Sequence, residues 1–173
     1  MLPLHLACSA FGKKVIFTME TCRRLIEANP QATKEKDFLG RLPLHYACEE
    51  LFSRSDYQDF VGGDFVSEVL KIYPEAVQIR DNLGDLPLHC LLMMLEDNPP
   101  AVHEYAGCVE VLEKQLVALI ETYPDSLLQS DVQNKLVLTT LAEFACPIHQ
   151  VWHTAGRLCT HASFVPLRNP CNH

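Results

Sequence analysis

The feature that most constrains this chain is a four-residue motif, Leu-Pro-Leu-His, that occurs three times. The copies are Leu2–His5, Leu42–His45 and Leu86–His89. Their prolines, Pro3, Pro43 and Pro87, are 40 and 44 residues apart. A chain of 173 residues does not repeat such a motif by chance, so we expect it to consist of similar units that follow one another.

A second proline keeps a fixed distance of 13 residues from the motif. The pairs are Pro30 with Pro43, Pro74 with Pro87, and Pro124 with Val137. The last pair reveals a degenerate fourth copy of the motif at Leu136–Thr139. The segment between this proline and the motif is therefore constant in length. The units differ in length in another part.

The constant segment contains a turn signal, Asp-x-x-Gly. The aligned aspartates are Asp37, Asp81 and Asp131, and the residues that align three positions later are Gly40, Gly84 and Asn134. Glycine and asparagine are the residues that most readily adopt a positive φ. We therefore predict a positive φ at this position in all three turns.

Each unit is predicted to contain two helices. Proline suits the first position of a helix, so a short helix is expected after each turn, such as Leu44–Phe52. A longer second helix follows, with apolar residues on one face. Those faces comprise Val15, Met19, Cys22, Leu25 and Ile26; Phe65, Val66, Val69, Leu70 and Tyr73; and Val109, Leu112, Leu116, Leu119, Ile120 and Tyr123. Helix pairs with one apolar side bury it by stacking, which predicts an all-α repeat solenoid.

The predicted boundaries follow the repeats. Residues 1–145 form the repeat region, with units at about 1–41, 42–85 and 86–135 and the start of a degenerate fourth unit at 136. Residues 146–173 are predicted to be a degenerate C-terminal cap or a Cys/His-rich tail. The first unit lacks the turn that precedes its motif, which favours a fragment of a larger protein and leaves an uncapped face through which the chain could self-associate.

The segments Lys36–His45 and Asp81–His89 resemble the ankyrin repeat, in which a turn and Thr-Pro-Leu-His-x-Ala precede two antiparallel helices. The chain departs from the family in its longer units, in leucine at the threonine position, and in proline at the end of the second helix. The resemblance implies an ankyrin-like helical solenoid. It also implies a structural role for His5, His45 and His89, each of which would tie the turn of one unit to its neighbour.

The resemblance further implies a non-catalytic adaptor or scaffold that binds a protein in the concave groove made by turn tips and first helices. The predicted partner-binding residues are Phe38, Arg41, Tyr46, Arg80, Asp81, Asn82, Asp85, Gln133 and Lys135. Lys36, Asp37 and Asp131 share the turn tips, and Leu6 and Cys90 occupy the helix position of Tyr46. Tyr46 is the strongest single candidate because it is aromatic and amphipathic.

Composition argues against several other classes of partner. The net charge is -8 and the pI about 5.4, which disfavours nucleic acid and anionic membranes. No apolar run approaches the roughly 18 residues of a membrane helix, and the first residues lack the pattern of a signal peptide. The eight cysteines are therefore interpreted as reduced thiols, in the cytoplasm or the nucleus.

Catalytic and cofactor motifs are lacking. The sequence has no Gly-x-Ser-x-Gly and no phosphate-binding Gly-Lys-Ser/Thr loop, so neither an enzyme nor a cofactor is expected. Two alternatives remain open. A zinc ion could stabilise the C-terminal segment through Cys146, His149, His153 and Cys159, whose donors suit zinc although no standard finger spacing fits. The repeats could also dock a catalytic domain that lies elsewhere in a larger protein.

Overall fold

The computed structural model describes residues 3–9, 19–49, 63–97 and 106–143. This part of the chain is all-α, as predicted, with seven α-helices and no strands. The α-helices are α1 (Pro3–Ser9), α2 (Met19–Ala28), α3 (Pro43–Glu49), α4 (Gly63–Ile72), α5 (Pro87–Asp97), α7 (Ala106–Thr122) and α8 (Val137–Glu143). None of the described helices has the length and apolar character needed to cross a membrane.

Proline marks two fixed places in this arrangement. It is the first residue of α1, α3 and α5, where the missing N–H costs no helical hydrogen bond. It also stands two residues after the last residue of α2, α4 and α7, and there it starts a short 3-10 helix. These are η1 (Pro30–Thr33), η4 (Pro74–Gln78) and η5 (Pro124–Leu128). Proline thus ends the second helix, as predicted, and redirects the chain into the turn.

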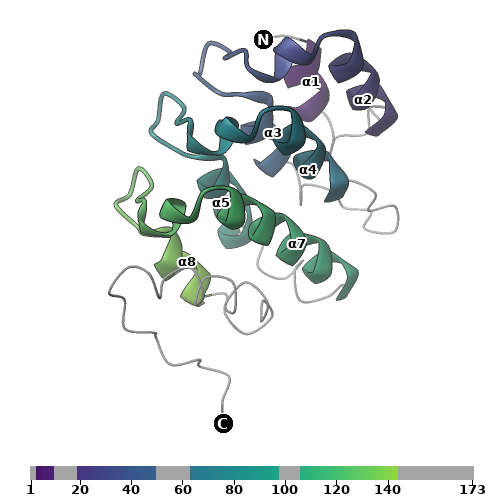
Figure 1. Cartoon of the computed structure of the whole chain (residues 1–173). Helices are drawn as coiled ribbons and strands as arrows, with labels where there is room; N and C mark the ends of the chain where they lie inside the picture. Colours follow the sequence, from purple (N-terminus) through teal and green to yellow (C-terminus); the bar gives the residue numbers. More distant parts are fainter. Residues whose placement is uncertain (1–2, 10–18, 50–62, 98–105, 144–173) are drawn as a thin grey trace.

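The helices form two layers (Figure 1). Helices α1, α3, α5 and α8 pack in succession in one layer, and α2, α4 and α7 follow in the other, where α4 packs on α7. Each predicted apolar face lies in the core wherever it is described. The buried members of these faces are Cys22 and Ile26 on α2; Val66, Val69 and Leu70 on α4; and Leu112, Leu116, Leu119 and Ile120 on α7.

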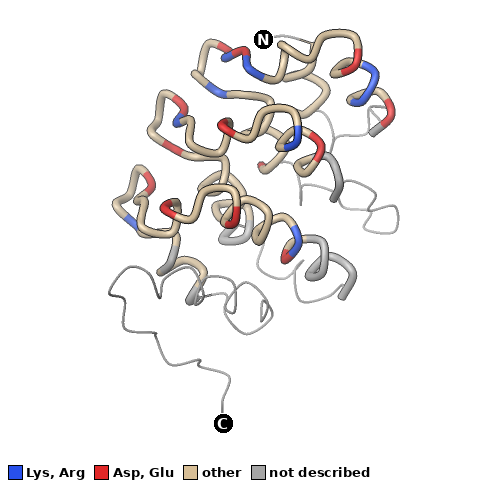
Figure 2. The backbone as a smooth tube through the Cα atoms, viewed as in Figure 1, with Lys and Arg blue, Asp and Glu red and all other residues tan. Residues whose placement is uncertain are grey.

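The three described turns connect the layers on one side of the molecule, at the left of Figure 1. They span residues 34–42, 79–86 and 129–136 and lie one beside the next. Charged residues are present in each of them (Figure 2). The first layer of helices thereby presents a row of turns along one edge, and most of the residues predicted to bind a partner lie there.

Candidate interaction surface

An aspartate side chain holds the backbone of each described turn. In the first turn, Asp37 Oδ1 accepts hydrogen bonds from the N–H groups of Leu39 and Arg41, at 2.9 and 3.0 Å. Asp81 and Asp131 accept the same two bonds, from residues two and four positions ahead. The two residues that follow each aspartate are therefore held at the tip of the turn.

The backbone at the fourth position of each turn is left-handed. The φ angles of Gly40, Gly84 and Asn134 are +73°, +94° and +61°. Asn134 is the one residue other than glycine with a positive φ among the described residues. The prediction of a positive φ at these three positions is confirmed, including the replacement of glycine by asparagine in the last turn.

Hydrogen bonds also join each turn to the next. The backbone N–H of Asn82 donates to the carbonyl of Leu39 at 2.9 Å, and its side-chain amide donates to the carbonyl of Phe38 at 3.1 Å. Between the second and third turns, Arg80 Nη1 donates to the carbonyl of Ser130 at 3.2 Å. Because these bonds fix neighbouring turns to one another, the turn tips form a single ordered edge.

Two of the three motif histidines, His5 and His45, form a hydrogen bond to a turn that follows them in the chain. His45 Nδ1 accepts the N–H of Leu42 at 3.1 Å, and its Nε2 donates to the carbonyl of Asp85 in the next turn at 3.3 Å. His5 Nε2 bonds in the same way to the carbonyl of Arg41, at 3.1 Å. Both ring nitrogens of His45 are occupied, so this ring has no free nitrogen for a metal ion.

Protonation of His45 would break this arrangement. Burial lowers its pKa to about 4, from an ordinary value near 6.5, so the neutral ring is the form that the fold stabilises. The unfolded chain binds the proton more readily than the folded chain between these two pKa values. The stability contributed by neutral His45 is therefore fully present above about pH 6.5 and is lost as the pH falls towards 4. Burial lowers the pKa of His89 as well, which adds a contribution of the same sign.

We expect the chain to lose about 2 kcal/mol more of its free energy of unfolding between pH 7 and pH 5 than a His45→Gln variant loses. Glutamine offers an NH₂ group as donor and a carbonyl oxygen as acceptor but does not titrate. Urea unfolding of both proteins at the two pH values, followed by circular dichroism, measures the difference. Equal losses in the two proteins would show that His45 is not the titrating group.

A partly buried network of charged and polar groups connects the first two turns. Arg41 Nε donates to Asp81 at 3.1 Å, its Nη1 donates to Glu49 at 2.6 Å, and its guanidinium lies 5.5 Å from the centre of the Tyr46 ring. The Tyr46 hydroxyl donates to Asp37 Oδ2 at 2.7 Å. Burial, followed by this bond to Asp37, raises the pKa of Tyr46 to about 12. The network links two consecutive turns with the helix between them.

The nine predicted partner-binding residues differ in how far they are exposed to solvent. The exposed ones are Phe38, Asn82 and Gln133; the half-buried ones are Arg41, Arg80 and Lys135; and the buried ones are Tyr46, Asp81 and Asp85. The buried side chains interact with other groups of the chain. A partner that docks on the turn tips therefore does not reach them. This corrects the emphasis placed on Tyr46, whose side chain bonds to Asp37 and is only 6% exposed.

Sequence reasoning missed the apolar residues beside Phe38 at the turn tips. Leu39, Leu83 and Val132 are 41%, 65% and 50% exposed, and Phe38 is 75% exposed. We call these four residues the turn-tip row. The signal was present in the sequence, because all four occupy the two positions after the turn aspartate, where the backbone turns towards solvent.

Some of the chain's metal-binding and thiol side chains lie among the described residues. No group of three or more His, Cys, Asp or Glu there is placed to hold a metal ion. The predicted zinc ligands Cys146, His149, His153 and Cys159 lie outside the described residues. Four cysteines of the described part of the chain are free and buried: Cys8, Cys22, Cys48 and Cys90. Burial raises the pKa of Cys90 to about 12, so its thiol is protonated at neutral pH.

The turn-tip row thus consists of exposed apolar side chains on turns that are joined by hydrogen bonds. Comparison of the chain with protein-family models, with curated proteins and with solved structures yields no match.

Proposed function

We propose that this chain is a non-catalytic protein-interaction module built of ankyrin-like repeats, and that its partner docks on the turn-tip row. The repeat interpretation is supported by the equivalence of successive units. Three turns share one aspartate pattern and one positive φ, and histidines of two successive motifs bond to the turn ahead. Such units form an extended surface rather than an enclosed active site.

The observation that carries the proposal is the exposure of the turn-tip row. Four large apolar side chains lie in solvent at the tips of neighbouring turns, where polar residues are the rule. Apolar surface gathered in one place marks an interaction site more reliably than scattered apolar residues do. The turns are already joined by hydrogen bonds, so a partner would not have to order them, and less binding free energy is lost on association.

The side chains of the turn-tip row indicate what kind of surface a partner should present. Phe38 and Leu83 are the most exposed members and provide the anchors, so the partner should present an apolar surface to them. Lys36 and Asn82, both exposed, lie in the same turns and supply a polar rim. Asn82 keeps its hydrogen bond to Phe38, which fixes the position of the first anchor.

Affinity capture with the full chain and with a Phe38→Ser/Leu83→Ser variant tests the proposal. A protein bound through the row should be captured at least about tenfold less by the variant, because each anchor contributes about 1–2 kcal/mol. Leu128→Ser is the matched control, since Leu128 is 49% exposed but lies in η5, outside the row. Equal capture by parent and double variant would reject the row as the binding surface.

A further inference from the structure

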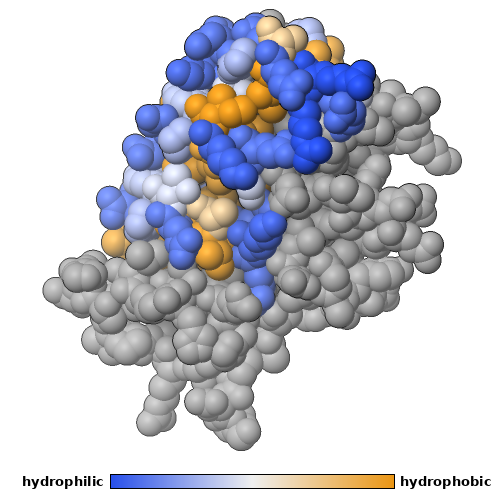
Figure 3. Space-filling model, turned by 45° about the vertical axis from the view of Figure 1, so that its right-hand side comes forward, coloured by the Kyte–Doolittle hydropathy of each residue, from blue (hydrophilic) through white to orange (hydrophobic). Residues whose placement is uncertain are grey.

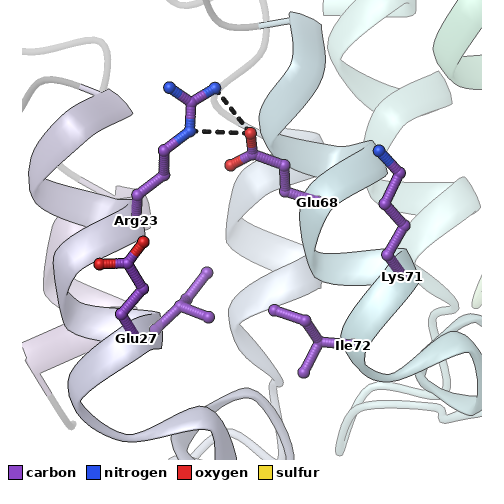
Figure 4. Close-up of a pocket in the computed structure, with 6 residues that line it drawn as sticks. Arg23, Glu27, Glu68, Lys71 and Ile72 are labelled. Atoms are coloured by element: carbon purple, nitrogen blue, oxygen red, sulfur yellow. Dashed lines mark hydrogen bonds and ion pairs between the residues drawn. The ribbon is translucent and has the colours of Figure 1, made fainter.

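A second surface lies between helices α2 and α4, and it shares no residue with the turn-tip row. A groove of about 310 Å³ opens there, and Figure 4 shows the side chains that line it. They are Arg23, Ile26 and Glu27 from α2 and Glu68, Lys71 and Ile72 from α4. On this side of the molecule, apolar surface is visible between hydrophilic side chains (Figure 3).

The groove exists because α2 and α4 are not closely packed at this point. Helix α4 packs on α7, but within the described residues α2 makes no comparable contact with α4. Arg23 spans the gap instead, and its Nη2 and Nε lie 2.6 and 2.8 Å from Glu68 Oε1. This ion pair lies in the lining of the groove and links the two helices.

The floor of the groove is apolar. Ile26 is 6% exposed and belongs to the core, whereas Ile72 is 38% exposed and presents part of its side chain to solvent. Figure 4 shows Ile72 beneath the ion pair, on the α4 side of the opening. A single large apolar side chain placed here would cover Ile72, and the volume is at the lower limit for a ligand site.

The two edges of the groove carry opposite charges. Glu27 lies on the α2 edge and Lys71 on the α4 edge, and both are exposed (Figure 4). Neither side chain makes a hydrogen bond or an ion pair with any part of the chain that the structure describes. An acidic and a basic group therefore flank an apolar floor, and both are available to a bound molecule.

From this arrangement we infer that the α2/α4 groove binds a peptide segment of a partner protein. The segment carries one aliphatic or aromatic side chain, with a basic residue on the Glu27 side and an acidic residue on the Lys71 side. The complementary charges select such a segment over one with two like charges, because like charges would face Glu27 or Lys71 unfavourably. This inference is independent of the turn-tip row, which lies in other elements.

Synthetic peptides with the pattern charge-Ala-Phe-Ala-charge test the inference by NMR titration of the full chain at low salt. Lys-Ala-Phe-Ala-Glu should bind about three- to fivefold more tightly than the peptides with two Lys or two Glu residues, the range expected for a surface ion pair. Replacing its Phe by Gly should abolish binding. A peptide of mixed charge can bind in either chain direction, so the comparison does not depend on the orientation of the segment.

Charge variants of the groove make the test decisive. Lys71→Glu leaves two acidic edges and should shift the preference to the peptide with two Lys residues. Glu27→Lys should shift it to the peptide with two Glu residues, and Ile72→Ser should weaken all of them. Lys71→Gln is the milder variant if Lys71→Glu unfolds the chain, and it should remove the preference for the peptide of mixed charge over that with two Lys residues.

Three results would overturn the inference: no peptide perturbs the groove residues, the preference is the same in every variant, or the chain is a dimer that Ile72→Ser dissociates. The last result would assign the groove to a second copy of the chain. Phe38→Ser should leave peptide binding unchanged, so failure of the groove and failure of the turn-tip row can be told apart.

Discussion

Replacing Arg41 by methionine is expected to lower the free energy of unfolding by about 3 kcal/mol. The side chain of its partner Asp81 has no exposed surface, and Arg41 is itself only 15% exposed. Without the guanidinium, Asp81 keeps only its bonds to backbone N–H groups and becomes a buried charge without a counter-ion. Burial raises the pKa of Asp81, but its hydrogen bonds, Arg41 among their donors, outweigh burial and hold it below the ordinary value.

Urea unfolding of the Arg41→Met variant measures this cost. Arg24→Met is the matched control, because Arg24 pairs with Glu20 on the exposed face of α2 and should contribute less than about 0.5 kcal/mol. Adding Asp81→Asn to Arg41→Met should recover part of the loss, since the unpaired charge is removed. A cost for Arg41→Met no larger than that for Arg24→Met would contradict a structural role for the network.

The second large effect is expected at Gly40. A Cβ at this position would lie 2.4 Å from Asn82 Oδ1 and 3.0 Å from the backbone nitrogen of Asn82, and φ is +73°. Gly84 also has a positive φ, +94°, but a Cβ there would have nothing within 4 Å. We therefore expect Gly40→Ala to cost about 3 kcal/mol, from backbone strain and steric overlap, and Gly84→Ala about 1 kcal/mol, from strain alone.

Thermal and urea unfolding of the two alanine variants test this difference directly. Combining Gly40→Ala with Asn82→Gly removes the side-chain overlap and should restore a part of the stability, although the backbone nitrogen remains close. Equal costs at Gly40 and Gly84 would mean that the first and second turns are not in the close contact that the structure gives them.

The repeated elements of this fold could be predicted from the sequence, because local residues determine them. Proline at a helix start, aspartate in a turn and glycine at a positive φ each follow from the chemistry of one residue and its neighbours. Asn134 illustrates this. Its alignment with Gly40 and Gly84 alone predicted a positive φ, and the structure gives +61°.

The accessibility of individual side chains could not be predicted in the same way. Asp81 was expected at the surface because it lies in a turn, but Arg41, 40 residues earlier, covers it. Tyr46 was expected to contact a partner, but its hydroxyl bonds to Asp37. The α2/α4 groove depends on the separation of two helices that are distant in sequence, and no local pattern in either helix indicates it.

The docking of a partner on the turn-tip row can be tested by site-specific photo-crosslinking. A photoreactive amino acid is placed in turn at Phe38, at Leu83 and, as a control, at Leu128, and each full chain is irradiated with its captured partner. We expect Phe38 and Leu83 to yield adducts with the same protein and Leu128 to yield none. Adducts from Leu128 alone, or capture without any adduct from the row, would contradict this expectation.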